Sequence, residues 1–203
     1  MMTRPISPYA AALGDRRARL APALQRYFDT IPAGHVGRGE GVFHVVGTPR
    51  RWLWPLLRPL QRSGIVPAGF WRDVPFTVVN RTVGDRGIGV RTFHLPTGDF
   101  TTTDIVARSG DGTADAIGLP TRVAARFDLD VIDEKLTITS SRIGLRIGRL
   151  RLGTPPWFRA RIRIVEYPEG DRQGMSFTLD LPLFGRVYEY RGSFRWYDIE
   201  EEA

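Results

Sequence analysis

The chain has 203 residues, of which 42% are hydrophobic and 25% charged, and it contains no cysteine. Such a composition is typical of a globular protein, and a chain of this length buries roughly 70% of its unfolded surface without disulfide bonds. The lack of cysteine excludes a disulfide-stabilised scaffold, a thiolate metal site and a cysteine nucleophile. Of the 29 basic residues, all but Lys135 are arginine, and the formal net charge is +7.

The net charge lies in the first third of the sequence. Residues 1–62 contain ten arginines and three acidic residues, whereas residues 63–203 contain 19 basic and 19 acidic residues. Arginines gathered on one face can bind the phosphates of nucleic acid or of anionic lipid. An arginine-for-lysine bias, with the arginines in ordinary solvated positions, explains the same count. No zinc-finger, RRM or OB signature is present, so we predict no nucleic-acid partner.

The first 72 residues have the spacing of short helices and one strand. Ser7 followed by Pro8 is typical of a helix start, and a second start is expected at Pro22. The glycine-rich segment 36–46 predicts a strand. No apolar signal-peptide segment is visible, and no stretch approaches about 18 uncharged apolar residues. The sequence therefore predicts a cytoplasmic protein.

A helix is expected over residues 50–62, with Trp52, Leu56 and Leu60 on one stripe. This segment contains four arginines and no acidic residue. One interpretation is a basic amphipathic helix lying on an anionic membrane. The other is a helix packed across the mouth of a curved sheet, with its arginines in water.

Beyond residue 72, apolar and polar residues alternate with the period of half-buried strands. The clearest run is 123–131, and short glycine- and aspartate-rich turns separate it from similar runs. Residues 73–198 therefore predict an antiparallel meander of about nine strands. We expect one mainly β domain over 1–203, a curved antiparallel sheet or partly open barrel with residues 1–72 covering it.

One predicted hairpin contains the candidate catalytic residue. Pairing Leu95 with Phe100 sets Arg91 opposite Asp104, an opposite-charge pair. His94 then lies on the other face among threonines, where a neutral imidazole can act as acid or base. The alternative is an exposed histidine without a catalytic role.

The last hairpin supplies candidate ligand contacts. Pairing Leu179 with Tyr188 sets Phe177 opposite Tyr190, and Trp196 shares their strand parity. Such an aromatic ladder either packs in the core or lines a cavity.

Two further polar pairs are candidates for a polar site. Glu189 and Arg191 share one face of the last strand, and Arg91 and Asp104 pair in the earlier hairpin. The alternative for both pairs is an exposed ion pair on the sheet. With three histidines in the chain, we predict no metal site.

The C-terminal segment resembles a bacterial family called domain of unknown function 4166. The shared pattern is a Leu-Pro-Leu-x-Gly turn followed by Tyr-x-Gly, here Leu181-Pro182-Leu183, Gly185, Tyr190 and Gly192. Earlier pieces match in order over about residues 8–196: Tyr9 with Leu13-Gly14-Asp15, Asp73-Val74-Pro75-Phe76, and the hairpin from Arg91 to Phe100. The sequence departs from the family at His94, where members tend to have Arg or Trp, and at Ser193 or Phe194, where members tend to have Trp. The resemblance implies the architecture but no chemistry.

The sequence predicts that the protein binds a hydrophobic small molecule, lipid-like or polyketide-like, in a cavity of the sheet. No nucleotide, metal or covalent-catalysis motif is present, so any reaction is expected to be a cofactor-free isomerisation or cyclisation. The predicted ligand-binding residues are Trp52, Leu56, Phe177, Tyr188, Tyr190 and Trp196. The alternative is a membrane-surface or partner-binding module that docks through residues 50–62.

Overall fold

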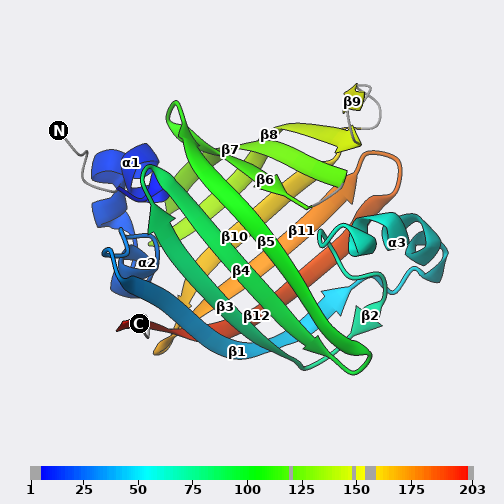
Figure 1. The fold of residues 1–203 in the computed structure, drawn as a ribbon, viewed down its shortest axis with the longest axis horizontal. Coiled ribbons are helices and arrows are strands. Elements are labelled where there is room, and N and C mark those ends of the chain that lie inside the picture. The colour runs from blue at the N-terminus through cyan, green and yellow to red at the C-terminus, as the bar shows by residue number, and fades with distance from the viewer. Residues whose placement is uncertain (1–5, 119–120, 148–149, 154–158, 201–203) are drawn as a thin grey trace.

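A closed antiparallel β-barrel is the main feature of the computed structural model, which describes residues 6–118, 121–147, 150–153 and 159–200 (Figure 1). Ten strands form the ring. They are β1 (His35–Gly47), β3 (Val74–Val83), β4 (Arg86–Leu95), β5 (Gly98–Ser109), β6 (Gly112–Ile117), β7 (Thr121–Ile132), β8 (Lys135–Ile147), β10 (Arg161–Glu169), β11 (Arg172–Leu181) and β12 (Gly185–Glu200). Two further strands are attached to the ring, β2 (Phe70–Trp71) to β1 and β9 (Leu150–Gly153) to β8.

The barrel closes where β10 pairs with β8, placing Ile164 opposite Ile138. Closure pairs both edges of every strand in the ring, which removes the exposed edges of an open sheet. The predicted fold class is confirmed in its closed form, with twelve strands in the described part of the chain instead of about nine. The additional strands are short or rich in glycine and threonine, which weakens their alternating pattern.

The two predicted hairpin registers have different outcomes. In the β11–β12 hairpin, Leu179 pairs with Tyr188 as predicted. In the β4–β5 hairpin the predicted register is wrong, because Leu95 pairs with Gly98 across a two-residue turn, not with Phe100. The φ of 112° at Gly98 is a left-handed value that glycine adopts readily. Since the shift is by two residues, every side chain stays on its predicted face.

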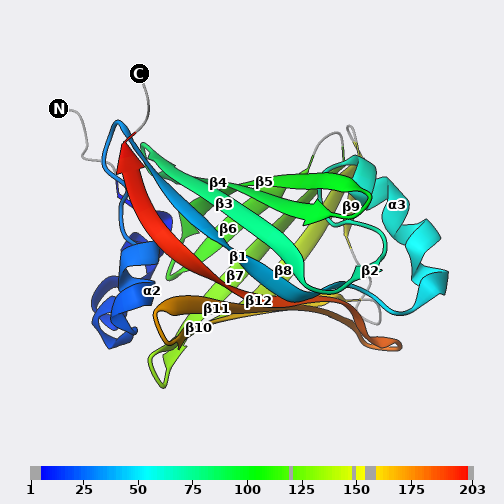
Figure 2. The ribbon, with the colours of Figure 1, turned by 90° about the horizontal axis from the view of Figure 1, so that it is seen from below.

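Short helices lie at the two ends of the barrel (Figures 1 and 2). At one end, α1 (Pro8–Leu13) begins after Ser7, whose hydroxyl accepts a hydrogen bond from the Ala10 N–H, and a 3-10 helix (Gly14–Arg19) and α2 (Pro22–Tyr27) follow. At the other end lie a 3-10 helix (Arg51–Leu53) and α3 (Trp54–Arg62). The helix starts expected at Pro8 and Pro22 are confirmed.

The 3-10 helix Arg51–Leu53 and α3 together present two adjacent apolar stripes, and the barrel buries one of them. Leu53 and Leu57 pack with Val187 and Tyr188 of β12. The neighbouring stripe is exposed, with Trp52 at 53% and Leu56 at 66%. Of the predicted stripe, Trp52 and Leu56 therefore point outwards, whereas Leu60 packs against the buried cluster and lines the cavity.

Glycines on β1 make room for the aromatic core of the barrel. A side chain on Gly37 would overlap the ring of Trp196, and one on Gly39 would lie 2.8 Å from Phe194. The same face carries Phe43, which is fully buried among other aromatic rings. The Gly37-x-Gly39-x-Gly41 pattern thus serves packing within the barrel.

Candidate functional site

A cavity of about 400 Å³ lies inside the barrel. Inward-facing side chains of the strands form its wall, while Tyr9 and Phe28 line it at the α1–α2 end and Ile65 and Val66 at the α3 end. The cavity therefore extends along the barrel between its two helical ends. Its volume lies in the range of small-molecule sites, which run from roughly 300 to 1,000 Å³.

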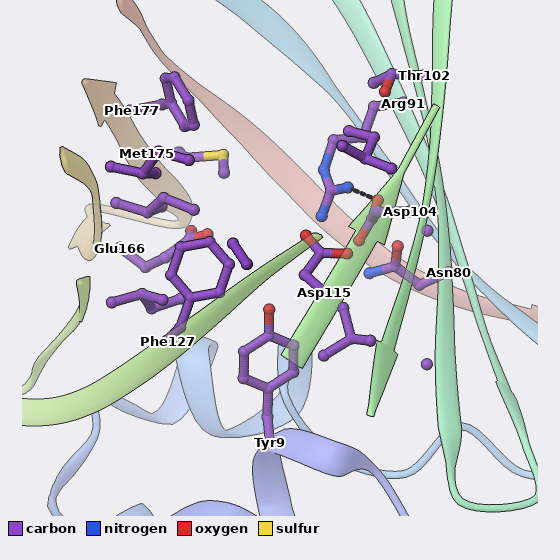
Figure 3. A pocket seen from close by; sticks show the side chains of 18 of the residues that line it. Tyr9, Asn80, Arg91, Thr102, Asp104, Asp115, Phe127, Glu166, Met175 and Phe177 are labelled. Atoms are coloured by element: carbon purple, nitrogen blue, oxygen red, sulfur yellow. Dashed lines mark hydrogen bonds and ion pairs between the residues drawn. The ribbon is translucent and has the colours of Figure 1, made fainter. Parts of the chain in front are cut away.

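One wall of the cavity is apolar except for Glu166 of β10 (Figure 3). It comes from strands β7, β8, β10 and β11, and its residues include Phe127, Ile138, Ile164, Met175 and Phe177 (Figure 3). These residues alternate along their strands with residues that face solvent, which is why a period-two sequence produces this wall. An apolar molecule placed here would lose its contact with water, which favours binding.

The opposite wall carries a polar cluster. Arg91 on β4 donates to the carboxylate of Asp104 on β5, and both side chains line the cavity (Figure 3). Gly89 pairs with both Asn80 and Asp104. A Cβ at Gly89 would lie 2.8 Å from Asp104 Oδ1, 3.1 Å from Asn80 Oδ1 and 3.2 Å from Arg91 Nη1. The glycine thus leaves the space in which these three polar groups meet.

Two further carboxyl groups line the cavity, and burial changes how they titrate. Burial raises the pKa of Asp115 to about 6, against the opposing effects of the Arg91 charge and the Ala116 N–H. Burial also raises the pKa of Glu166 to about 7, opposed by a hydrogen bond from Gln173 and by Arg91. The Gln173 Nε2 donates to Glu166 Oε2 over 2.6 Å. Both carboxyl groups therefore exchange protons near neutral pH.

Tyrosine hydroxyl groups complete the polar surface. Burial raises the pKa of Tyr9, Tyr27 and Tyr190 above the ordinary value for tyrosine, so all three are neutral phenols at physiological pH. Tyr9, from α1, directs its hydroxyl towards Asp115 (Figure 3). A neutral phenol both donates and accepts hydrogen bonds, so these groups can meet a polar group on a ligand.

The structure brings five of the predicted site residues to the cavity. Phe177, Tyr188 and Tyr190 line it from the last hairpin, and Arg91 and Asp104 line it from β4 and β5. The ion pair predicted between Arg91 and Asp104 is present. The two residues are diagonal neighbours, however, because Asp104 lies opposite Gly89.

Strand parity places three other candidates on the outside of the barrel. His94 alternates with Arg91 and Phe93, so it faces outwards, where its Nδ1 lies 2.9 Å from Asp99 Oδ1. Glu189 and Arg191 are also on the outer face, and Glu189 lies 3.4 Å from Arg186. The cavity-lining residues do not include these three.

The last three candidates also lie away from the cavity wall. Trp52 and Leu56 are on the exposed stripe of the α3 end. Trp196 packs against the core, with its ring 4.7 Å from that of Tyr27. Trp196 therefore contributes to packing around the α1–α2 end of the barrel.

The sequence analysis missed Asn80, Asp115, Glu166 and Tyr9. A signal was present for Glu166, because it follows Ile162 and Ile164 at the spacing of an inward-facing strand position. A charged residue in an otherwise apolar inward series is expensive to bury and marks a functional candidate. Asp115 gives a weaker signal, since β6 is short and its alternation is poor.

The site contains no metal centre within the described residues, where no three histidine or acidic side chains come together as ligands. The described helices are also too short or too polar to cross a lipid bilayer. The fold and the cavity define a closed ten-stranded antiparallel barrel with a polar cluster on one interior wall.

The chain belongs to the family described as Domain of unknown function (DUF4166), whose model matches residues 20–194. This match confirms the resemblance seen in the sequence. No curated protein and no solved structure matches the chain.

Proposed function

We propose that the protein binds a hydrophobic small molecule, lipid-like or polyketide-like, inside the barrel. The observation that carries the proposal is the cavity of about 400 Å³ with an apolar wall facing a small set of polar groups. Cavities of this kind bury most of a ligand's surface, and a few polar groups orient it. The ligand-contacting residues proposed for the chain are Phe177, Tyr188 and Tyr190, with Arg91 and Asp104 as polar contacts.

Filling the cavity from Ala125 tests this proposal. Ala125 is buried and lines the cavity, whereas Ala124 on the same strand faces solvent. We expect Ala125→Phe to weaken binding of the neutral dye Nile red by at least about tenfold, equivalent to 1.4 kcal/mol, because the new ring occupies ligand space. The control Ala124→Phe adds the same ring outside and should leave affinity unchanged.

Dye fluorescence titration and native mass spectrometry of the purified protein provide the two readouts. The proposal would be contradicted if Ala125→Phe and Ala124→Phe bound the dye equally well. It would also be contradicted if neither experiment detected a small molecule bound to the unaltered protein.

A cofactor-free isomerisation or cyclisation in the same cavity is a second candidate function. It is favoured by Asp115 and Glu166, two cavity-lining carboxyl groups whose pKa values lie near neutral. A group of this kind can take up and release a proton during a reaction. His94 has no place in this proposal, because its ring is on the outer face.

The test uses the small molecule that co-purifies with the protein, incubated in D2O with the unaltered protein and with Glu166→Gln. Proton transfer predicts deuterium uptake at a carbon of the ligand, lost or strongly slowed in the variant. Ligand recovered without deuterium from the unaltered protein would overturn the catalytic proposal and leave binding as the function.

Docking of the α3 end on an anionic membrane is a third candidate. Trp52 and Leu56 join Leu183 and Phe184 of the β11–β12 turn in one apolar patch, with the rings of Trp52 and Phe184 5.5 Å apart. Arg50 donates to the carbonyl of Phe184 and Arg51 lies over the ring of Trp54, and the arginines of residues 50–62 form no ion pair within the described part of the chain. Exposed apolar side chains beside unpaired positive charge suit a surface of anionic lipid.

Vesicle co-sedimentation tests the docking. The double variant Trp52→Ser/Leu183→Ser should lose most binding to phosphatidylglycerol vesicles at low salt. The matched control Val83→Ser/Ile132→Ser removes two other exposed apolar side chains and should bind normally. Membrane docking is contradicted if the unaltered protein does not bind the vesicles, or if its binding does not weaken as the salt concentration rises. The patch is then expected to contact another protein.

A further inference from the structure

Several polar atoms that line the cavity lack hydrogen-bond partners among the residues that the structure describes. Asn80 Oδ1, Thr102 Oγ1 and Asp115 Oδ1 are buried and form no hydrogen bond, and all three residues line the cavity. Buried polar atoms are nearly always hydrogen-bonded, since leaving one unpaired costs free energy. These three unpaired atoms, from β3, β5 and β6 on one wall, therefore indicate where a polar group of the ligand lies.

The chemistry of these atoms favours a ligand that donates hydrogen bonds. An ionised carboxylate such as Asp115 only accepts hydrogen bonds, and a threonine hydroxyl does both. The Asn80 side chain lies beside Asp104 and Arg91 around Gly89, so its amide is part of the same wall. Figure 3 shows Asp115, Asp104 and Asn80 together, facing Glu166 across the cavity.

The charge of the interior leads to the same result. Three buried carboxyl groups, Asp104, Asp115 and Glu166, line the cavity together with the buried guanidinium of Arg91, whereas Arg81, the other arginine among the described lining residues, is exposed. The charge of Arg91 is already balanced by Asp104, which weakens its attraction for an acidic ligand. An incoming carboxylate would also meet the Asp115 carboxylate, and like charges in a buried site repel strongly.

We propose that the ligand, if the cavity binds a small molecule as proposed above, carries an amine or hydroxyl group that donates to Asp115. Free fatty acids and other carboxylates are therefore not preferred ligands. The apolar part of the molecule lies against Met175 and Phe177 on the opposite wall.

Three compounds with the same alkyl chain test the inference: decylamine, decanol and decanoate. Isothermal titration calorimetry and native mass spectrometry measure their binding to the unaltered protein. We expect decylamine and decanol to bind at least about tenfold tighter than decanoate, because they can donate a hydrogen bond to the Asp115 carboxylate and ionised decanoate cannot.

The variant Asp115→Asn removes one acceptor charge without changing side-chain size. It should reduce the preference for decylamine over decanoate by about tenfold, while Asp128→Asn, on the exposed face of β7, leaves the preference unchanged. Melting temperatures of both variants confirm that they fold.

The outcomes separate this inference from the proposed function. Decanoate binding as tightly as decylamine, with both blocked by Ala125→Phe, would overturn the donor requirement and leave the cavity as a binding site. An unchanged decylamine preference in Asp115→Asn would overturn the role of Asp115. No binding of any of the three compounds would overturn the binding function and the inference together.

Discussion

Replacing Arg91 by methionine is expected to lower the free energy of unfolding by about 3–5 kcal/mol, because it leaves a buried carboxylate without its partner. Asp104 is 3% exposed and is held by Arg91 inside the barrel. Methionine keeps most of the apolar stem but removes the charge, so the loss reports the uncompensated Asp104. Urea unfolding at neutral pH, followed by circular dichroism, measures the effect.

Two further variants show whether the ion pair is the cause. Arg86→Met removes an exposed arginine from the same strand and should change stability by less than about 0.5 kcal/mol. The double variant Arg91→Met/Asp104→Leu removes both charges and should recover most of the loss, since well-packed apolar residues replace buried ion pairs at little cost. A double variant as unstable as Arg91→Met would contradict this explanation.

The sequence predicted the barrel because its strands follow a local rule. Alternation over residues 123–131 requires only the neighbouring residues, and it placed Ala125 and Phe127 inside as the structure has them. The same rule kept Arg91 and Asp104 on one face although the predicted register was wrong. An even shift of register leaves the faces unchanged.

The polar cluster was much harder to predict. Asp115 and Glu166 come from β6 and β10, and they meet across a cavity only after the ring has closed. No local pattern shows which distant strands face each other in a barrel. The prediction for His94 was wrong for a different reason. A histidine was chosen as the catalytic candidate because of its chemistry, but it is one position from the inward-facing Phe93 and therefore lies on the outside of the barrel.

The exposed stripe at the α3 end of the barrel shows a third limit of prediction from sequence. Leu53 and Leu57 lie beside Trp52 and Leu56, so the sequence offers two apolar faces of similar strength. Which of the two faces is buried depends on the surface of the barrel against which the helix packs. Here Leu53 and Leu57 pack against the first residues of β12. Helical periodicity identifies an amphipathic helix but does not choose between adjacent apolar stripes.

Glu166 is expected to make the protein less stable as the pH rises. Its pKa in the folded protein is about 7, compared with 4.5 for an unperturbed glutamate, so the folded state holds the proton more tightly than the unfolded state. The stabilising contribution is therefore complete below pH 4.5 and is lost as the pH rises to about 7. Because one pKa unit corresponds to about 1.4 kcal/mol, the loss is about 3 kcal/mol.

The variant Glu166→Gln tests this dependence, since a glutamine keeps the shape of the protonated side chain and cannot ionise. Unfolding in urea should give equal stability for the variant and the unaltered protein at pH 4, and a more stable variant at pH 8. Glu169→Gln, at the exposed end of the same strand, is the matched control and should match the unaltered protein at both values. If the difference between Glu166→Gln and the unaltered protein is the same at both pH values, Glu166 is not the buried, proton-holding group described here.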